Sequence, residues 1–317
     1  GIKICSIMER WRNVLSVPLE TRHGRRSYRV AVNLCLSRNS LTVPTANAVF
    51  FNGDRVENSR NPVVERLSDL QTLADLLISK FCESTNAWVV EASLFNESFA
   101  VYRDFIPDVT PFGEPKSYNP AGFPASTTTL ALLSECYRQV LTEVTVDGDY
   151  SSAAPPKIIL LGFSKGGIVI NQLLTELSIA GAKPHSIPRG SLPLGAHLIP
   201  ATIQSFLDSI SEIHYVDVGL NFGDAYITDY KVIDGISNRL SSGGGSGIRF
   251  FLHGTPRQWC DSNRAWIRLE KERLAKLLES AASKCSGKLQ VTERFYFSGR
   301  APSLQMHFEI IEKLDVS

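Results

Sequence analysis

The chain has 317 residues, 43% of them hydrophobic, and its 33 Lys and Arg nearly balance its 32 Asp and Glu. That length is enough for one large core, and the lack of a basic stripe argues against a nucleic-acid partner. The six cysteines form no C-x-x-C pair, so we expect neither a zinc site nor a disulfide framework. No apolar run approaches the roughly 18 residues that a transmembrane helix needs.

The N-terminal region is basic. Its first 40 residues carry eight Lys or Arg against two Glu, a bias typical of a transit peptide. A solvated basic β-hairpin would have the same composition, and residues 27–36 alternate like a strand. Both interpretations stay open. We expect one domain over residues 1–317, with residues 1–26 either a flexible or targeting N-terminus or part of that hairpin.

Further along, short apolar runs alternate with amphipathic stretches. Buried strands are predicted at residues 47–52, 87–92, 157–162, 213–218, 248–252 and 289–297. Helices are predicted at residues 67–82, 127–144, 166–179, 199–210, 263–283 and 306–314. This alternation predicts an α/β protein with a mostly parallel central sheet and helices on both faces.

Two segments interrupt the alternation. Residues 106–126 hold five prolines and several aromatic residues, and residues 181–200 are also rich in Pro and Gly. Loops of this length in a compact domain are usually functional or disordered. The aromatic residues of the first segment favour an ordered loop over a site and hint at an apolar substrate group.

The strand at 157–162 runs into Gly162-Phe163-Ser164-Lys165-Gly166 and then into a helix. This is G-x-S-x-G between a strand and a helix, the context of a nucleophile elbow in the α/β-hydrolase fold. Gly162 and Gly166 allow strand and helix to approach closely. Ser164 is therefore the predicted nucleophile, placed at a helix N-terminus that favours an oxyanion.

A serine nucleophile needs a base and a residue that orients the base, in the chain order serine, acid, histidine. His307 follows the last predicted strand and is the favoured base over His253, which ends an earlier strand. Asp261 is the favoured acid and Asp217 the alternative, since each follows a late strand. Asp261 would also suit a helix N-cap.

The oxyanion donors are predicted from the same fold logic. The backbone N–H of Lys165, directly after the serine, is the first donor. The second comes from the loop after the strand at 47–52, where Gly53 or Asp54 offers an N–H. The Lys165 side chain either reaches solvent or favours an anionic substrate.

Four segments carry a family resemblance: FFNGD, GFSKGG, HGTPRQWCDSNRAWI and QMHFEI. Together they resemble a eukaryotic family of uncharacterised proteins named for an open reading frame on human chromosome two, with the plant-type branch matching best. The resemblance runs from about Met8 to the end. It implies an α/β-hydrolase-like fold, a serine-hydrolase activity and, for animal members, a mitochondrial location. It implies no substrate.

The sequence thus predicts a serine hydrolase of the esterase, lipase or thioesterase type that needs no metal or organic cofactor. Its partner would be a small-molecule acyl substrate. The alternative is a catalytically silent hydrolase-fold scaffold or regulatory protein with a protein partner, because fold does not fix function. The compartment is left as mitochondrial or cytoplasmic.

Overall fold

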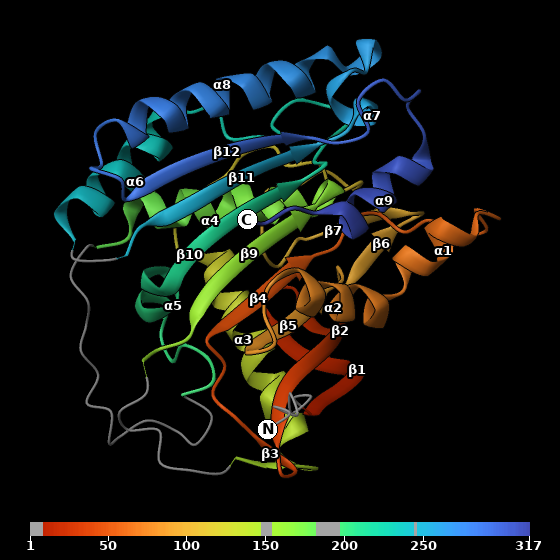
Figure 1. Ribbon diagram of the computed structural model, residues 1–317, viewed down its shortest axis with the longest axis vertical. Helices are drawn as coiled ribbons and strands as arrows, with labels where there is room; N and C mark the ends of the chain where they lie inside the picture. The colour runs from red at the N-terminus through yellow and green to blue at the C-terminus, as the bar shows by residue number, and fades with distance from the viewer. Residues whose placement is uncertain (1–8, 147–153, 182–196, 244–245) are drawn as a thin grey trace, which may run out of the picture.

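The structure is a computed structural model, and it describes residues 9–146, 154–181, 197–243 and 246–317. A twisted ten-stranded sheet crosses the molecule (Figure 1), with strand order β12-β11-β10-β9-β4-β5-β2-β3-β8 and β1 paired to β2. Its strands are β1 (Glu9–Thr21), β2 (Gly24–Ser37), β3 (Ser40–Leu41), β4 (Ala46–Phe51), β5 (Thr85–Val90), β8 (Thr145–Val146), β9 (Lys157–Phe163), β10 (Ile210–Val216), β11 (Ile248–Gly254) and β12 (Leu289–Phe295).

The remaining elements cover or extend this sheet. A separate hairpin consists of β6 (Leu94–Asn96) and β7 (Phe99–Val101). The helices are α1 (Pro62–Ser68), α2 (Leu70–Lys80), α3 (Pro124–Val140), α4 (Gly167–Ile179), α5 (Ile203–Ser209), α6 (Tyr230–Ser242), α7 (Pro256–Trp259), α8 (Ala265–Ala282) and α9 (Leu304–Lys313), with short 3₁₀ turns at Ser164–Gly166 and Ser262–Arg264. None of these helices is long and apolar enough to cross a membrane.

The strand pairing confirms the predicted fold class. Strands β5, β4, β9, β10, β11 and β12 pair with one another in parallel, in that order. Strand β2 pairs with β1 and with β5 in antiparallel fashion. A β-hairpin followed by parallel strands in this crossover order is the arrangement of the α/β-hydrolase fold. The carboxyl ends of the parallel strands then meet at one edge of the sheet, where sites in open α/β sheets form.

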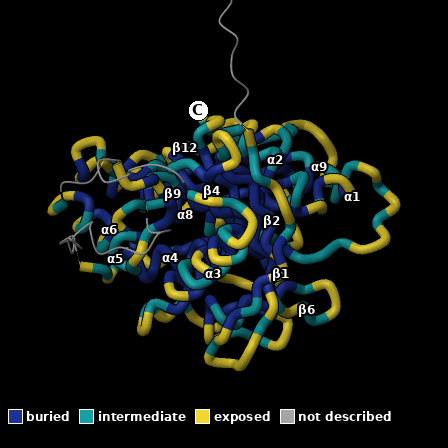
Figure 2. Tube along the Cα trace, turned by 90° about the horizontal axis from the view of Figure 1, so that it is seen from below, coloured by how far each residue is buried: buried dark blue, intermediate teal, exposed yellow. Residues whose placement is uncertain are grey.

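The central strands are buried on both faces, as their apolar sequences predict. On β9, Ile158 and Leu160 join one core, while Ile159, Leu161 and Phe163 join the other. Helices α1, α2 and α9 cover the second core, and α3, α4, α6 and α8 cover the first. Figure 2 shows the resulting buried interior between exposed outer turns.

Several predicted boundaries shift. The predicted helix at 67–82 is two helices, because the Asp69 side chain accepts a hydrogen bond from the Thr72 N–H and starts a new helix. Residues 9–26 lie in the β1–β2 hairpin, so the hairpin interpretation holds for them, and residues 1–8 lie outside the described residues. Helix α6 occupies a stretch for which no helix was predicted, and most of the segment at 181–200 is outside the described residues.

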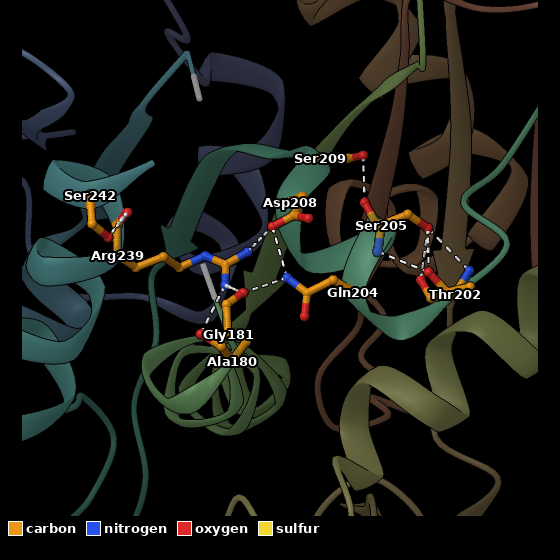
Figure 3. A network of polar contacts seen from close by, with 9 residues as sticks. All are labelled: Ala180, Gly181, Thr202, Gln204, Ser205, Asp208, Ser209, Arg239 and Ser242. Carbon is orange, nitrogen blue, oxygen red and sulfur yellow. Dashed lines mark hydrogen bonds and ion pairs between the residues drawn. The ribbon is translucent and has the colours of Figure 1, made fainter. Parts of the chain in front are cut away.

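Helix α4 begins at the predicted serine turn, and its far end is fixed by a polar network (Figure 3). Arg239 of α6 donates hydrogen bonds to the carbonyls of Ala180 (3.1 Å) and Gly181 (3.0 Å) and forms an ion pair with Asp208 of α5. Gln204 joins the network by donating to Gly181 and Asp208. A cation at a helix C-terminus donates hydrogen bonds to the free carbonyls and interacts favourably with the helix dipole.

We predict that Arg239→Met lowers the free energy of unfolding by about 1–3 kcal/mol, because it leaves the Ala180 carbonyl without its donor. It also leaves the Gly181 carbonyl and the Asp208 carboxylate with Gln204 as their donor in this network. The arginine side chain is only 9% exposed, so water replaces its bonds poorly. Arg268→Met on α8 is the matched control, since that side chain is 57% exposed and its loss should change little. Urea unfolding of the three proteins measures the difference; equal losses in both variants would contradict the role given to the network.

Candidate active site

The turn after β9 holds Ser164 in a strained conformation. Its φ is 53°, in the left-handed region that residues other than glycine rarely adopt. The 3₁₀ turn Ser164–Gly166 leads directly into α4. This is the predicted strand, tight turn and helix, with the serine at the carboxyl edge of the sheet.

Neighbouring atoms approach the turn so closely that two of its positions require glycine. A Cβ on Gly166 would lie 2.0 Å from the carbonyl oxygen of Phe51 at the end of β4. One on Gly162 would lie 2.6 Å from Cγ1 of Ile170 in α4. The turn therefore packs against the backbone that precedes Asn52 and Gly53, and only glycine fits there.

His307 and Asp217 form a buried pair beside this turn. Nδ1 of His307 lies 2.6 Å from Oδ2 of Asp217, and these two residues are 6% and 0% exposed. The Asp217 carboxylate also accepts hydrogen bonds from the N–H (2.8 Å) and hydroxyl of Thr255. The ring of Phe163 packs against the imidazole at 4.7 Å between centroids. Thus the histidine is fixed in orientation by both a charge and an aromatic ring.

Asp261, the favoured acid of the sequence analysis, does not contact His307. Its carboxylate accepts from the Asn263 N–H (2.9 Å) and from Nε of Arg264 (2.8 Å), so it caps the turn before α8. The chain turns away at α7 before it reaches Asp261, whereas Asp217 directly follows β10. The preference for Asp261 is therefore wrong in its geometry, and the alternative, Asp217, is the carboxylate at the histidine.

His253 does not belong to the site either. It is fully buried, with Nε2 3.0 Å from Nδ1 of His214 and Nδ1 2.7 Å from the hydroxyl of Tyr296. Burial lowers the pKa of both imidazoles. His253 therefore makes local hydrogen bonds at the end of its strand, and the preference for His307 over His253 agrees with these contacts.

Ser164 and His307 line one open cleft of about 260 Å³. Among the described residues, neither the serine hydroxyl nor Nε2 of His307 has a hydrogen-bond partner, and no bond joins them. Hydroxyl–imidazole contacts in hydrolases are often long without ligand. Both groups are consequently available to a molecule in the cleft.

The expected oxyanion loop contacts the serine directly. A Cβ on Gly53 would lie 2.7 Å from Cβ and 3.2 Å from Oγ of Ser164. The Gly53 N–H donates to the side chain of Asn52 at 3.0 Å, whereas the Asp54 N–H has no partner among the described residues. Of the two N–H groups predicted as the second donor, that of Asp54 is therefore the one without a partner.

The Lys165 side chain does not reach solvent, and its charge is not free in the cleft. It is 3% exposed, its Nζ donates to the Phe112 carbonyl, and it lies 3.8 Å from Oδ1 of Asp54. Burial lowers the pKa of Lys165 and raises those of Asp54 and Glu114, while the opposite charges act against each shift. The lysine thus fastens the Pro-rich loop to the serine turn.

The lining of the cleft differs from the apolar pocket hinted at by the Pro-rich loop. Phe105, directly before that loop, is buried in the core, and the loop itself presents Glu114 to the cleft. The charged residues of the lining are Asp54, Arg55, Glu114, Lys165, Arg257 and Arg264. The sequence assigns a role to neither Glu114, which lies outside the quoted segments, nor Arg257, which lies in HGTPRQWCDSNRAWI. Within the described ranges, no cluster of three or more His, Cys, Asp or Glu residues could hold a metal ion.

The strand order and the serine turn define a protein of the α/β-hydrolase fold. The chain belongs to the C2orf69 family, whose model matches residues 123–284, just over half of the sequence. A C2orf69 homolog of Danio rerio, named as a mitochondrial protein, is 26% identical over 71% of this chain and 59% of its own length. The Homo sapiens protein is 29% identical over 48% of this chain and 32% of its own length.

The chain thus spans less than two thirds of the length of these relatives. The relatives named are animal proteins, so the plant-type assignment stays a prediction.

Among solved structures, a ferulic acid esterase has a TM-score of 0.49 at 11% identity, covering 97% of each chain. The siderophore hydrolase EstA from Aspergillus nidulans has a TM-score of 0.46 at 14% identity, covering 97% of this chain and 92% of its own.

We predict that Gly166→Ala destabilises the protein by more than 1 kcal/mol, because the new methyl group meets backbone that cannot rotate away. Gly223→Ala is the control, since its nearest neighbour would be Glu270 at an ordinary 3.5 Å. Thermal unfolding compares the two. A Gly166→Ala protein as stable as the control would contradict the close approach of β4 to the turn.

The buried imidazoles of His214 and His253 predict acid sensitivity. Because their folded pKa values lie below the ordinary value of about 6.5, the unfolded chain binds more protons as the pH falls through that value. The free energy of unfolding should therefore fall on going from about pH 7.5 to 5.5. Urea unfolding at both pH values tests this, and His253→Gln should show a shallower dependence. An unchanged slope in the variant would remove His253 from the explanation.

Proposed function

We propose that this protein is a serine hydrolase that cleaves ester or thioester bonds with Ser164, His307 and Asp217. The observation that carries the proposal is the buried 2.6 Å contact between Asp217 and His307 in the cleft that also holds Ser164. A carboxylate at Nδ1 fixes the tautomer in which Nε2 can accept a proton. The strained serine turn supports the same role.

In the proposed reaction, the Ser164 hydroxyl attacks the substrate carbonyl and gives its proton to Nε2 of His307. The tetrahedral oxyanion accepts hydrogen bonds from the N–H groups of Lys165 and Asp54, with Gly53 as the alternative donor. Its collapse releases the alcohol or thiol, which takes the proton from His307. Water, activated by the same imidazole, then attacks the acyl-serine and releases the acid. Asp217 stabilises the imidazolium throughout.

The alternative is the scaffold that keeps the fold without the reaction. The lack of a hydrogen bond between Ser164 and His307 is compatible with a scaffold. An open cleft that contains a histidine–carboxylate pair favours an enzyme. The names of the animal relatives support a mitochondrial location as part of the proposal.

We predict that a fluorophosphonate probe labels the wild-type protein and fails to label Ser164→Ala. In Asp217→Asn, labelling should slow by about 10⁴-fold, because the amide stabilises the wrong imidazole tautomer. Asp261→Asn is the matched control and should react at the wild-type rate, since Asp261 contacts Arg264 and not the histidine.

Circular dichroism establishes that each variant is folded before labelling is compared. A folded wild-type protein that does not react would support the scaffold. Loss of labelling in Asp261→Asn with normal labelling in Asp217→Asn would contradict the assignment of the acid.

A further inference from the structure

Arg257 is a cation without a partner in the cleft. It lies in α7 and lines the same cleft as Ser164 and His307. Its side chain is half-buried, yet the guanidinium forms no hydrogen bond or ion pair with any residue that the structure describes. A guanidinium has five N–H donors in a rigid fork. Leaving them unpaired and partly desolvated is costly unless a ligand supplies the acceptors.

The other cations of the cleft already have acceptors. Arg55 lies 2.5 Å from Glu91, and Lys165 is held by Asp54 and the Phe112 carbonyl. Those pairs therefore leave no free positive charge on their side of the cleft.

Arg264 is likewise engaged, by Asp261 (2.8 Å) and by the side-chain oxygen of Gln258 (2.9 Å). Its charge nevertheless faces Arg257 and, after burial itself, is the main factor that lowers the pKa of Arg257. The two carboxylates that oppose this shift are Asp217 and Asp261. Each is already bonded elsewhere, to His307 and to Arg264. Arg257 is thus the guanidinium of the α7 side that has neither a hydrogen bond nor an ion pair with any described residue.

We propose that Arg257 binds a carboxylate of the substrate, so that the preferred esters or thioesters are acidic ones. The proposal rests on the proposed function of Ser164, because it places the carboxylate in the same cleft as the reacting carbonyl. An arginine fork recognises a carboxylate through two parallel hydrogen bonds. Such recognition also explains a polar cleft in place of an apolar acyl pocket.

The first test compares the hydrolysis of mono-p-nitrophenyl adipate with that of p-nitrophenyl hexanoate, which has the same acyl length without the carboxylate. The wild type should prefer the adipate. Arg257→Gln should lower kcat/KM for the adipate by about 10- to 100-fold and leave that for the hexanoate nearly unchanged. Arg257→Lys keeps the charge and loses the fork. Its kcat/KM for the adipate should lie between those of the wild type and Arg257→Gln.

Arg268→Gln is the matched control, because it removes the same charge from an exposed position on α8 and should leave the preference intact. Equal rates on both esters in the wild type, or an unchanged preference in folded Arg257→Gln, would overturn the proposal.

The second test measures binding without turnover. In the Ser164→Ala background, calorimetry measures the binding of monomethyl adipate and of inorganic phosphate. Monomethyl adipate should bind more tightly than phosphate, and Arg257→Gln should abolish its binding. Binding that survives the substitution, or binding of phosphate in preference to the carboxylate, would overturn the assignment. If the wild type fails to react with fluorophosphonate but binds adipate through Arg257, the hydrolase function fails while the carboxylate site stands.

Discussion

The candidate site depends on the close approach of the end of β4 to the turn after β9. Gly166 lies so near the Phe51 carbonyl that no side chain fits between them. This contact sets Gly53 against Ser164 and holds the serine at a positive φ. The same approach places the proposed oxyanion loop and the proposed nucleophile side by side, although more than 100 residues separate them in the chain.

Charge balance shapes the cleft around this contact. Lys165 would be an unusual neighbour for a nucleophile if it were free, but it is buried between Asp54 and a loop carbonyl. Its role is to fasten the Pro-rich loop to the serine turn. The loop in turn brings Glu114 to the cleft, and Arg257 on α7 is left without a hydrogen bond or ion pair among the described residues. The polarity of the cleft follows from these pairings rather than from any single motif.

The sequence predicts the fold well because buried parallel strands such as β4 and β9 leave a local apolar pattern, and because G-x-S-x-G marks a specific turn. It predicts Ser164 and His307 from their places after strands. It cannot choose between Asp217 and Asp261, since both follow strands that end at the same edge and only the path of α7 separates them. Arg257 lies in a segment that carries the family resemblance, but the sequence assigns it no role, because what distinguishes it is the lack of a partner in three dimensions.

The proposed activity requires that His307, held by Asp217, activates Ser164. The most direct measurement is the intact mass of the folded protein after reaction with a fluorophosphonate, followed by mapping of the modified peptide. We expect one adduct per chain, located on Ser164. A folded protein without an adduct, or with its adduct on another residue, would contradict it.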